Sequence, residues 1–348
     1  MTRAIDLRHF FRLCDGTGIL QHATFAVPCR AHGYCTDDVA RALVVAVGLR
    51  ELVAGADRER LVEIEHVMLS FLLDAFNPAL GRFRNFMAYD RRWLEEGGSD
   101  DSWGRAMWGL GTAAAAGRSD GGRRLAREVF NGGRPARRSM TSLRAWAYGL
   151  LGYAAIPETA VPGELHDEAL ELVDRLLASY GNASRRGWRW CEPVATYDNA
   201  IVPLALQRAG CVLGLSAPCR AAREMGEWLF DAQTAPIGHL SLFGNEGWCA
   251  DTERRATFDQ QPIDAASLAM LAFELWRDTG ENEWRRRGES ALAWFRGHND
   301  LKTSLVDAET GGCCDGLTAE GVNLNQGAES TLVWLMARHA EVLASVER

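Results

Sequence analysis

The chain has 348 residues, of which 47% are hydrophobic, and it carries a formal net charge of -8. This acidic balance argues against a nucleic-acid-binding surface, because such a surface needs a basic stripe. No stretch reaches the roughly 18 uninterrupted apolar residues that a membrane-spanning helix requires. We therefore expect a globular protein that binds neither nucleic acid nor a membrane.

The nine cysteines do not form a disulfide pattern, because their number is odd and no Cys-x-x-Cys pair occurs. Residues 1–30 lack the charged start and the apolar stretch of a secretory signal. We therefore expect a cytoplasmic protein with reduced thiols. The His-x-His and His-Glu-x-x-His spacings that indicate metal sites are also missing, so we predict no metal and no other cofactor.

The first buried helix is predicted directly after residue 35. Before it, residues 4–14 read as a short amphipathic helix and residues 21–34 as an irregular loop. Thr36 is suited to cap a helix, and Asp37 and Asp38 fall in the first turn, where the helix dipole favours negative charge. An almost wholly apolar run follows, so we expect a helix that is buried along its length and polar only at its N-terminus.

The same pattern, a polar start followed by an apolar run, returns five more times along the chain. These repeats begin at Ser99, Ser139, Thr196, Gln261 and Asn325. Between them lie segments whose apolar residues recur at helical spacing on one face, which predicts half-exposed helices. These segments are 58–76, 123–130, 164–180, 217–232 and 283–297.

The alternation of buried and half-exposed helices predicts the fold. One polar residue marks each buried helix, at Asp37, Asp101, Ser142, Asp198, Asp264 and Glu329, and neighbours in this series are 41 to 66 residues apart. Such irregular spacing excludes a solenoid of identical repeats. We predict an all-α fold, an (α/α)6 toroid that forms one domain over residues 1–348. The sixth outer helix would come from residues 4–14 or be missing, and residues 187–192 and 239–243 would form short β-hairpins in the loops.

Carboxylates, amides and aromatic rings gather in and before the polar helix starts. This combination is typical of a carbohydrate site, because rings stack on sugars, polar groups bind hydroxyls, and paired carboxylates serve as acid and base. The catalytic candidates are Asp38 or Asp101 on one side of the pocket and Glu192 or Glu329 on the other. The candidates for substrate binding are Tyr34, Asp37, Arg41, Asp90, Arg92, Trp93, Trp103, Trp188, Trp190, Tyr197, Asp198, Asn199, Asp259, Gln260, Gln261, Asn325 and Gln326.

Each of these signals also has a purely structural interpretation. An acidic residue at a helix N-terminus, such as Asp37 or Asp101, is an ordinary cap, although one carboxylate is enough for capping and the first helix has two. Trp188 and Trp190 also suit a packing hairpin. Glu329 lies inside an otherwise apolar helix, where a buried carboxylate needs a partner, and this favours a functional role.

Six motifs, taken in order, resemble a family of bacterial and archaeal (α/α)6 glycosidase-like domains. The motifs are His32-Gly-Tyr-Cys-Thr-Asp-Asp, Tyr89-Asp-Arg-Arg-Trp, Gly98-Ser-Asp-Asp-Ser, Tyr197-Asp-Asn-Ala, Phe258-Asp-Gln-Gln-Pro-Ile and Asn325-Gln-Gly-Ala-Glu-Ser-Thr. The resemblance covers residues 13–334, and it implies a toroid and a carbohydrate substrate. Members of this family occur alone or joined to glycosyltransferases, near mannoside-processing enzymes, so the resemblance also implies a functional association with a glycosyltransferase. Val39 and Trp103 depart from the family pattern, which usually has Asn and His there.

The sequence therefore predicts a glycoside hydrolase that acts on an oligosaccharide or glycoconjugate, with mannose as one candidate sugar. Three alternatives stay open at this point. A phosphorylase would bind phosphate through Arg41, Arg91, Arg92 and Arg105, and an epimerase would use His22 and His32. The third alternative is a non-catalytic sugar-binding domain that assists a glycosyltransferase.

Overall fold

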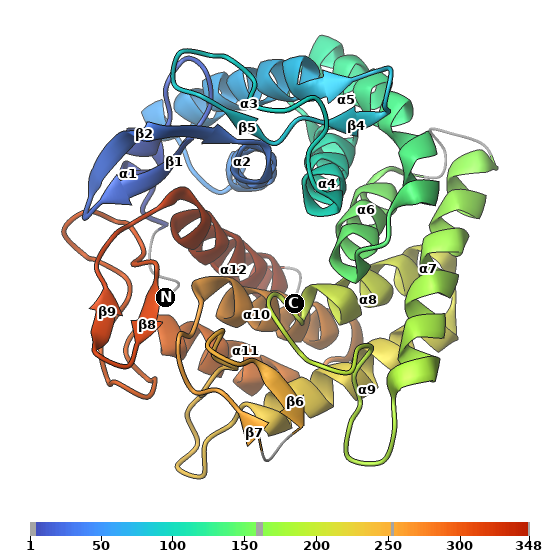
Figure 1. Cartoon of the computed structure of the whole chain (residues 1–348), viewed down its shortest axis with the longest axis vertical. Coiled ribbons are helices and arrows are strands. Elements are labelled where there is room, and N and C mark those ends of the chain that lie inside the picture. The colour runs from blue at the N-terminus through green and yellow to red at the C-terminus, as the bar shows by residue number, and fades with distance from the viewer. Residues whose placement is uncertain (1–4, 158–162, 252–253, 347–348) are drawn as a thin grey trace.

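The computed structural model describes residues 5–157, 163–251 and 254–346. Six helices form an inner ring, and the others pack outside it (Figure 1). The inner helices are α2 (Thr36–Leu49), α4 (Asp100–Ala116), α6 (Leu143–Ala155), α8 (Ile201–Leu213), α10 (Pro262–Thr279) and α12 (Ala328–Val346). The outer helices are α3 (Ala56–Ala75), α5 (Asp120–Gly133), α7 (Glu164–Ala183), α9 (Ser216–Ala232) and α11 (Asn282–Phe295).

The ring closes because α12 packs against both α10 and α2. A short helix, α1 (Arg8–Leu13), packs against α12 from outside and takes the place of the sixth outer helix. The predicted (α/α)6 toroid is therefore confirmed, and the described part of segment 4–14 contributes its predicted outer helix.

The burial of the helices follows their sequences. In α10 every residue from Pro262 to Trp276 is buried, as expected for a helix that is apolar on all sides. In the outer helix α5 the buried apolar residues are Ala126, Val129 and Phe130, which lie on one face. None of the helices formed by the described residues is both long and apolar enough to cross a membrane.

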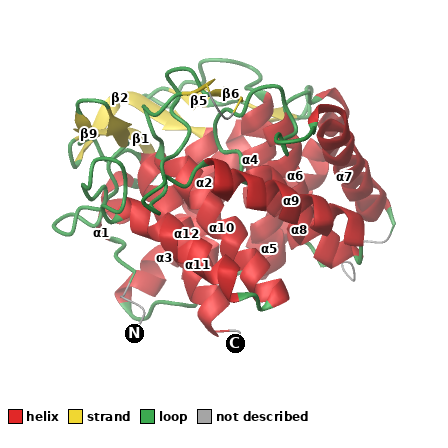
Figure 2. Cartoon of the chain, turned by 90° about the horizontal axis from the view of Figure 1, so that it is seen from below, coloured by secondary structure: helices red, strands yellow, loops and turns green. Residues whose placement is uncertain are grey.

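The strands and long loops gather at one end of the ring, where the inner helices begin (Figure 2). We call this end the mouth. One sheet there has the order β1-β2-β5, and three two-stranded hairpins join β3 to β4, β6 to β7 and β8 to β9. The strands are β1 (Leu20–Thr24), β2 (Val27–Cys35), β3 (Phe76–Asn77), β4 (Arg82–Phe83), β5 (Phe86–Met87), β6 (Cys249–Asp251), β7 (Arg254–Arg255), β8 (Gly316–Thr318) and β9 (Gly321–Asn323). A 3-10 helix, η1 (Arg134–Ser139), connects α5 to α6.

Two predictions about the loops were wrong. Segment 21–34 forms most of the hairpin β1-β2 and is not an irregular loop. Its strands were not predicted because they contain Pro28 and Gly33, and both residue types are depleted in strands. Segments 187–192 and 239–243 form only isolated bridges, Arg185 with Trp188 and Thr234 with Leu240. The expectation that short hairpins occur in the loops holds, but at other positions.

Glycines let the inner helices α4 and α6 approach closely. A Cβ atom at Gly111 would overlap the carbonyl oxygen of Gly152, and one at Gly152 would overlap that of Met107. The two backbones are thus in direct contact, with no side chain between them.

We expect Gly111→Ala to lower the free energy of unfolding by about 1–3 kcal/mol, because the added methyl group must push α4 and α6 apart. Gly121 is the matched control, since it is exposed on α5 and a Cβ there meets nothing within 4 Å. Gly121→Ala should raise the free energy of unfolding by roughly 0.5–1 kcal/mol through helix propensity. Denaturant titration measures both changes, and equal effects of the two substitutions would contradict the close contact of α4 and α6.

Candidate active site

A polar cavity opens at the mouth, between the first turns of the inner helices. Its larger part has a volume of about 690 Å³, and an adjoining part has about 340 Å³. The residues that line both parts are Asp37, Gln261 and Glu329. The larger part is lined in addition by Ser99, Asp100, Asp101, Arg105, Ser142, Tyr197, Asn245, Trp248 and Ile263. The smaller part is lined in addition by Gln21, His22, Cys35, Asp38, Arg41, Phe86, Pro262, Asp315, Gly327 and Ser330.

A single guanidinium joins two of the predicted catalytic carboxylates. Arg41 donates to Asp38 Oδ1 at 2.8 Å through one terminal nitrogen and to Glu329 Oε2 at 2.6 Å through the other. Asp38 and Arg41 lie one turn apart on α2, and Glu329 lies in the first turn of α12. Asp38 is buried, whereas 47% of the Glu329 side chain remains exposed because it faces the cavity.

The two carboxylates differ in their electrostatic surroundings. Burial, together with the charges of Glu329 and Asp37, raises the pKa of Asp38 to about 7 against the opposing effects of Arg41 and Arg105. Burial also acts to raise the pKa of Glu329, but Arg41 and Arg105 outweigh it and bring that pKa below its usual value. Near neutral pH one carboxyl therefore holds a proton for much of the time while the other is ionised.

Asp101 lies in the first turn of α4 and is fixed by two hydroxyl groups. Ser142 donates to its Oδ1 at 2.8 Å and Tyr197 donates to its Oδ2 at 2.6 Å. Behind Tyr197, Arg144 stacks on the ring with 4.5 Å between its Cζ and the centroid, and it donates to Glu192 at 2.9 Å. Glu192 is thus held in an ion pair and does not line the cavity, although it was predicted to lie across the pocket from Asp38 or Asp101.

Arg105 connects the cavity to a buried polar chain. One of its terminal nitrogens donates to the Tyr148 hydroxyl at 2.7 Å, and that hydroxyl donates to Asp198. Asp198 is buried at the end of this chain with a left-handed backbone, φ 45°, and its neighbour Asp264 is buried as well. Burial raises the pKa of Asp198, and burial together with the charge of Asp198 raises that of Asp264. Asp198 therefore supports the cavity from below and does not line it.

Three of the predicted tryptophans are packed inside the protein. Trp103 is fully buried and donates to the carbonyl of Gly133 at 2.9 Å. Trp188 and Trp190 are buried against Trp228, with ring centroids 4.9 and 6.3 Å from it. These buried rings expose no face to a ligand, so Trp188 and Trp190 cannot stack on a sugar as predicted. Burying such large rings in the apolar core stabilises the fold more than exposing them in a cavity wall would, because large aromatic side chains dominate core energetics.

Other predicted binding residues are likewise engaged in structural contacts. Tyr34 is buried and donates to Asp15 at 2.6 Å. Asp90 and Arg92 form an exposed ion pair at 2.8 Å, and Trp93 donates to Asp74 at 3.1 Å. The structural interpretation therefore fits these four residues.

The predicted amides and Asp259 mainly hold the loops of the mouth together. The described contacts are Asn199 with Arg144, the carbonyl of Asp259 with the Asn245 N–H, Gln260 with Trp294 and Asp300, Asn325 with the Phe25 N–H, and Gln326 with Thr310 and Asp307. Of the predicted set, the structure brings Asp37, Asp38, Arg41, Asp101, Tyr197, Gln261 and Glu329 together at the cavity.

Trp248 is not among the predicted residues, yet it lines the cavity with its ring centroid 6.4 Å from that of Tyr197. It lies in the loop before β6, outside the recurring polar starts, so the pattern gave no signal for it. Arg105 entered only as part of a phosphate site. Its position one turn after Asp101 on α4, matching Arg41 after Asp38 on α2, is the signal that would have paired it with the carboxylates.

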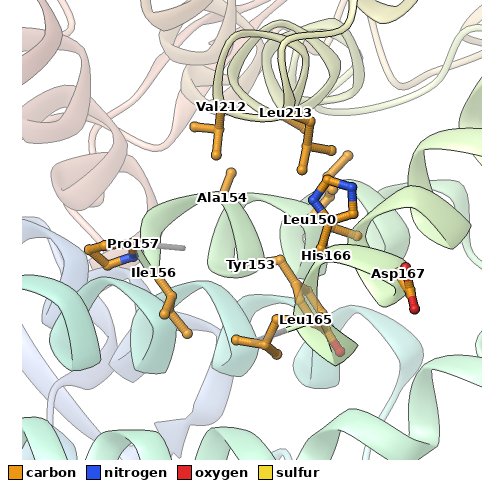
Figure 3. Close-up of a pocket in the computed structure, with 13 residues that line it drawn as sticks. Leu150, Tyr153, Ala154, Ile156, Pro157, Leu165, His166, Asp167, Val212 and Leu213 are labelled. Carbon is orange, nitrogen blue, oxygen red and sulfur yellow. The ribbon is translucent and has the colours of Figure 1, made fainter. Parts of the chain in front are cut away.

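Two further features of the described residues bear on the choice of site. They contain no group of three or more His, Cys, Asp and Glu side chains placed to hold a metal ion. A mostly apolar cavity of about 330 Å³ lies at the opposite end of the ring, where α6 and α8 end (Figure 3). Leu150, Leu165, Val212 and Leu213 are among the residues that line it, and no set of carboxylates converges there. The mouth is therefore the candidate active site.

Known proteins resemble this chain in structure but not in sequence. Neither a scan against protein-family models nor a search of curated proteins finds a match. Solved structures do match. Cellobiose 2-epimerase from Bacillus thermoamylovorans B4167 is 9% identical with a TM-score of 0.75, over 97% of this chain and 95% of that one. A D-mannose isomerase is 10% identical with a TM-score of 0.73, over the same shares. The GH76 α-mannanase of Bacteroides thetaiotaomicron is 12% identical with a TM-score of 0.61, over 90% of this chain and 87% of that one. These similarities support the (α/α)6 toroid.

Proposed function

We propose that the protein is a glycoside hydrolase whose reaction takes place in the mouth cavity. One observation carries this proposal: Asp38 and Glu329 share Arg41, yet their surroundings move their pKa values in opposite directions. Paired carboxyl groups with separated pKa values are what glycoside hydrolysis requires, since one must donate a proton and the other must accept one or attack. The toroid carbohydrate enzymes with similar structures support a sugar as the ligand.

In this proposal Asp38 is the general acid that protonates the departing glycosidic oxygen. Glu329 is ionised and serves as the base that activates water or as the nucleophile. Arg41 holds both carboxyl groups in place through its hydrogen bonds and takes no part in the proton transfer. Asp101, fixed by Ser142 and Tyr197, accepts hydrogen bonds from sugar hydroxyls, and the rings of Tyr197 and Trp248 offer apolar surface to a sugar face.

The test is a screen of α- and β-linked manno- and gluco-oligosaccharides, run with and without phosphate. The proposal predicts release of reducing sugar that does not depend on phosphate. Phosphate-dependent release of a sugar phosphate would indicate a phosphorylase instead. Arg41 already binds two carboxylates and Arg92 binds Asp90, which leaves these arginines poorly placed for phosphate.

An epimerase is the second candidate, and a histidine at the cavity favours it. His22 lines the smaller part of the cavity, where the charges of Asp315 and Glu329 act to raise its pKa. Burial and the neighbouring His32, whose ring centroid is 4.7 Å away, lower the pKa of His22, so the imidazole is neutral near pH 7 and able to accept a proton.

Deuterium separates the two candidates. An epimerase that removes and returns a proton on carbon incorporates deuterium from D₂O into unreacted or isomerised sugar, without breaking a glycosidic bond. We expect no carbon-bound deuterium and cleavage of the glycosidic bond. His22→Gln is then expected to retain hydrolysis, whereas loss of all turnover in this variant, together with deuterium uptake, would favour the epimerase. Binding of sugar with no turnover of any kind would instead indicate a binding domain.

A further inference from the structure

Three arginines lie buried around the mouth, and one of them makes fewer hydrogen bonds than the other two. Arg41 donates to two carboxylates, and Arg144 donates to Glu192, to Asn199 and to the carbonyl of Tyr197. Arg105 makes a single hydrogen bond within the described residues, to Tyr148, although only 7% of its side chain is exposed. Its Nε has no hydrogen-bond partner.

The remaining terminal nitrogen of Arg105 lies 3.4 Å from Asp37 Oδ1. This distance exceeds the 2.7–2.9 Å typical of a charge-assisted hydrogen bond, and Asp37 Oδ1 has no hydrogen-bond partner in the part of the chain that the structure describes. Arg105 and Asp37 thus form a long ion pair, and both residues line the larger part of the cavity, although Asp37 Oδ1 itself is closed to solvent. A guanidinium N–H that makes no hydrogen bond is costly to bury, so a ligand atom that accepts from this terminal nitrogen of Arg105 is bound with a gain.

A hydroxyl group matches this pair, because it accepts one hydrogen bond and donates another. We propose that Arg105 and Asp37 together bind one hydroxyl group of an uncharged sugar and so determine substrate specificity. The inference rests on the proposed function for its substrate class. Arg105 donates to the hydroxyl oxygen, and the Asp37 carboxylate accepts its proton in a hydrogen bond.

The charge of the cavity excludes an anionic group at the same position. Among the described residues, four carboxylates line the larger part of the cavity, and Arg105 is the one arginine there. A sugar carboxylate or phosphate bound at Arg105 would approach these like charges in a partly desolvated space, where repulsion is strong. Uronic acids and sugar phosphates are therefore poor substrates.

Tyr148 acts as a positioning residue for Arg105. Its hydroxyl accepts from Arg105 and donates to the buried Asp198, so the proton on the hydroxyl points away from Arg105. Its ring also lies 4.5 Å from the guanidinium carbon, a cation–π contact. The guanidinium is thereby fixed in the orientation that places its remaining terminal nitrogen beside Asp37.

The experiment combines enzyme variants with monodeoxy analogues of a neutral substrate. In the wild type, removing one particular hydroxyl should lower kcat/KM by roughly 100-fold, the expected loss of a hydrogen bond to a charged group. In Arg105→Met the same deoxy analogue and the parent sugar should differ by less than roughly threefold. Tyr148→Phe should fall in between, with the change mainly in KM. A purely structural role of Arg105 would lower the turnover of all sugars equally and leave the discrimination unchanged, which would overturn the inference.

Matched controls keep the result interpretable. Arg60→Met removes an exposed arginine paired with Glu63 on α3 and should leave the discrimination as in the wild type. Arg105→Lys keeps the charge, so it should fold even if the methionine variant does not. It loses the planar fork of the guanidinium, so it should still discriminate poorly between the parent sugar and the deoxy analogue. Calorimetric titration with the same sugars reports the discrimination as Kd. Sugar binding without turnover would contradict the proposed hydrolysis and still test Arg105, whereas discrimination retained in both arginine variants contradicts the role of Arg105 alone.

Discussion

Asp38→Asn is expected to lower kcat by about 10²–10⁴-fold, the usual contribution of a positioned general acid. The amide is isosteric with the carboxyl group, and its oxygen can still accept the hydrogen bond from Arg41 that Asp38 Oδ1 accepts at 2.8 Å. It cannot release a proton to a departing oxygen. The loss should therefore appear in kcat, with KM and the melting temperature close to those of the wild type.

The control for this substitution is Asp120→Asn. Asp120 also lies in the first turn of a helix, α5, but it is exposed and pairs with Arg123 on the outside of the ring. A surface pair of this kind contributes little, so kcat should not change. If Asp38→Asn kept full activity, Asp38 would have no part in the proton transfer.

Glu329→Gln is expected to reduce kcat by a similar factor of about 10²–10⁴, because the ionised carboxylate is the base or nucleophile in the proposed reaction. The pH dependence distinguishes its role from that of Asp38. Wild-type activity should fall as the pH rises through about 7, since the acid Asp38 then loses its proton. It should also fall as the pH drops through the lowered pKa of Glu329, where the base becomes protonated.

In Glu329→Gln the acidic limb of this profile should disappear. The alkaline limb should move below 7, because Glu329 no longer raises the pKa of Asp38 and Arg41 is left to pair with Asp38 alone. Residual activity measured from pH 4 to pH 9 checks both changes. An alkaline limb that stays at the wild-type position would contradict the coupling of the two carboxyl groups through Arg41.

Much of the fold was accessible from sequence because each inner helix repeats one physical pattern. Acidic or hydroxyl residues in the first turn, followed by residues that are apolar on all sides, predict a buried helix with an exposed start, and α2 and α10 show this plainly. The hairpin β1-β2 was not accessible, because its strands contain Pro28 and Gly33 and owe their stability to pairing with each other and with β5. Strand formation of this kind depends on tertiary contacts more than on local preference.

The structure brings four of the predicted carboxylates to the mouth cavity, whereas the predicted tryptophans Trp103, Trp188 and Trp190 lie in the core. Asp37, Asp38, Asp101 and Glu329 lie in the first turns of the helices, so the toroid fold by itself directs them to one cavity. A tryptophan carries no such positional constraint. Trp103 follows Asp101 closely on α4 yet points into the core, whereas Trp248, in a loop far from any helix start, lines the cavity. Which face of a helix or loop a ring occupies is decided by packing that one sequence does not display.

The most direct test of the proposed hydrolysis is to run the reaction in ¹⁸O-labelled water and to measure the masses of the products by mass spectrometry. We expect the wild type to incorporate one ¹⁸O atom for each glycosidic bond that it breaks, and Asp38→Asn to incorporate none above background. Turnover to an isomeric sugar with an intact glycosidic bond, or cleavage to a sugar phosphate without ¹⁸O, would contradict it.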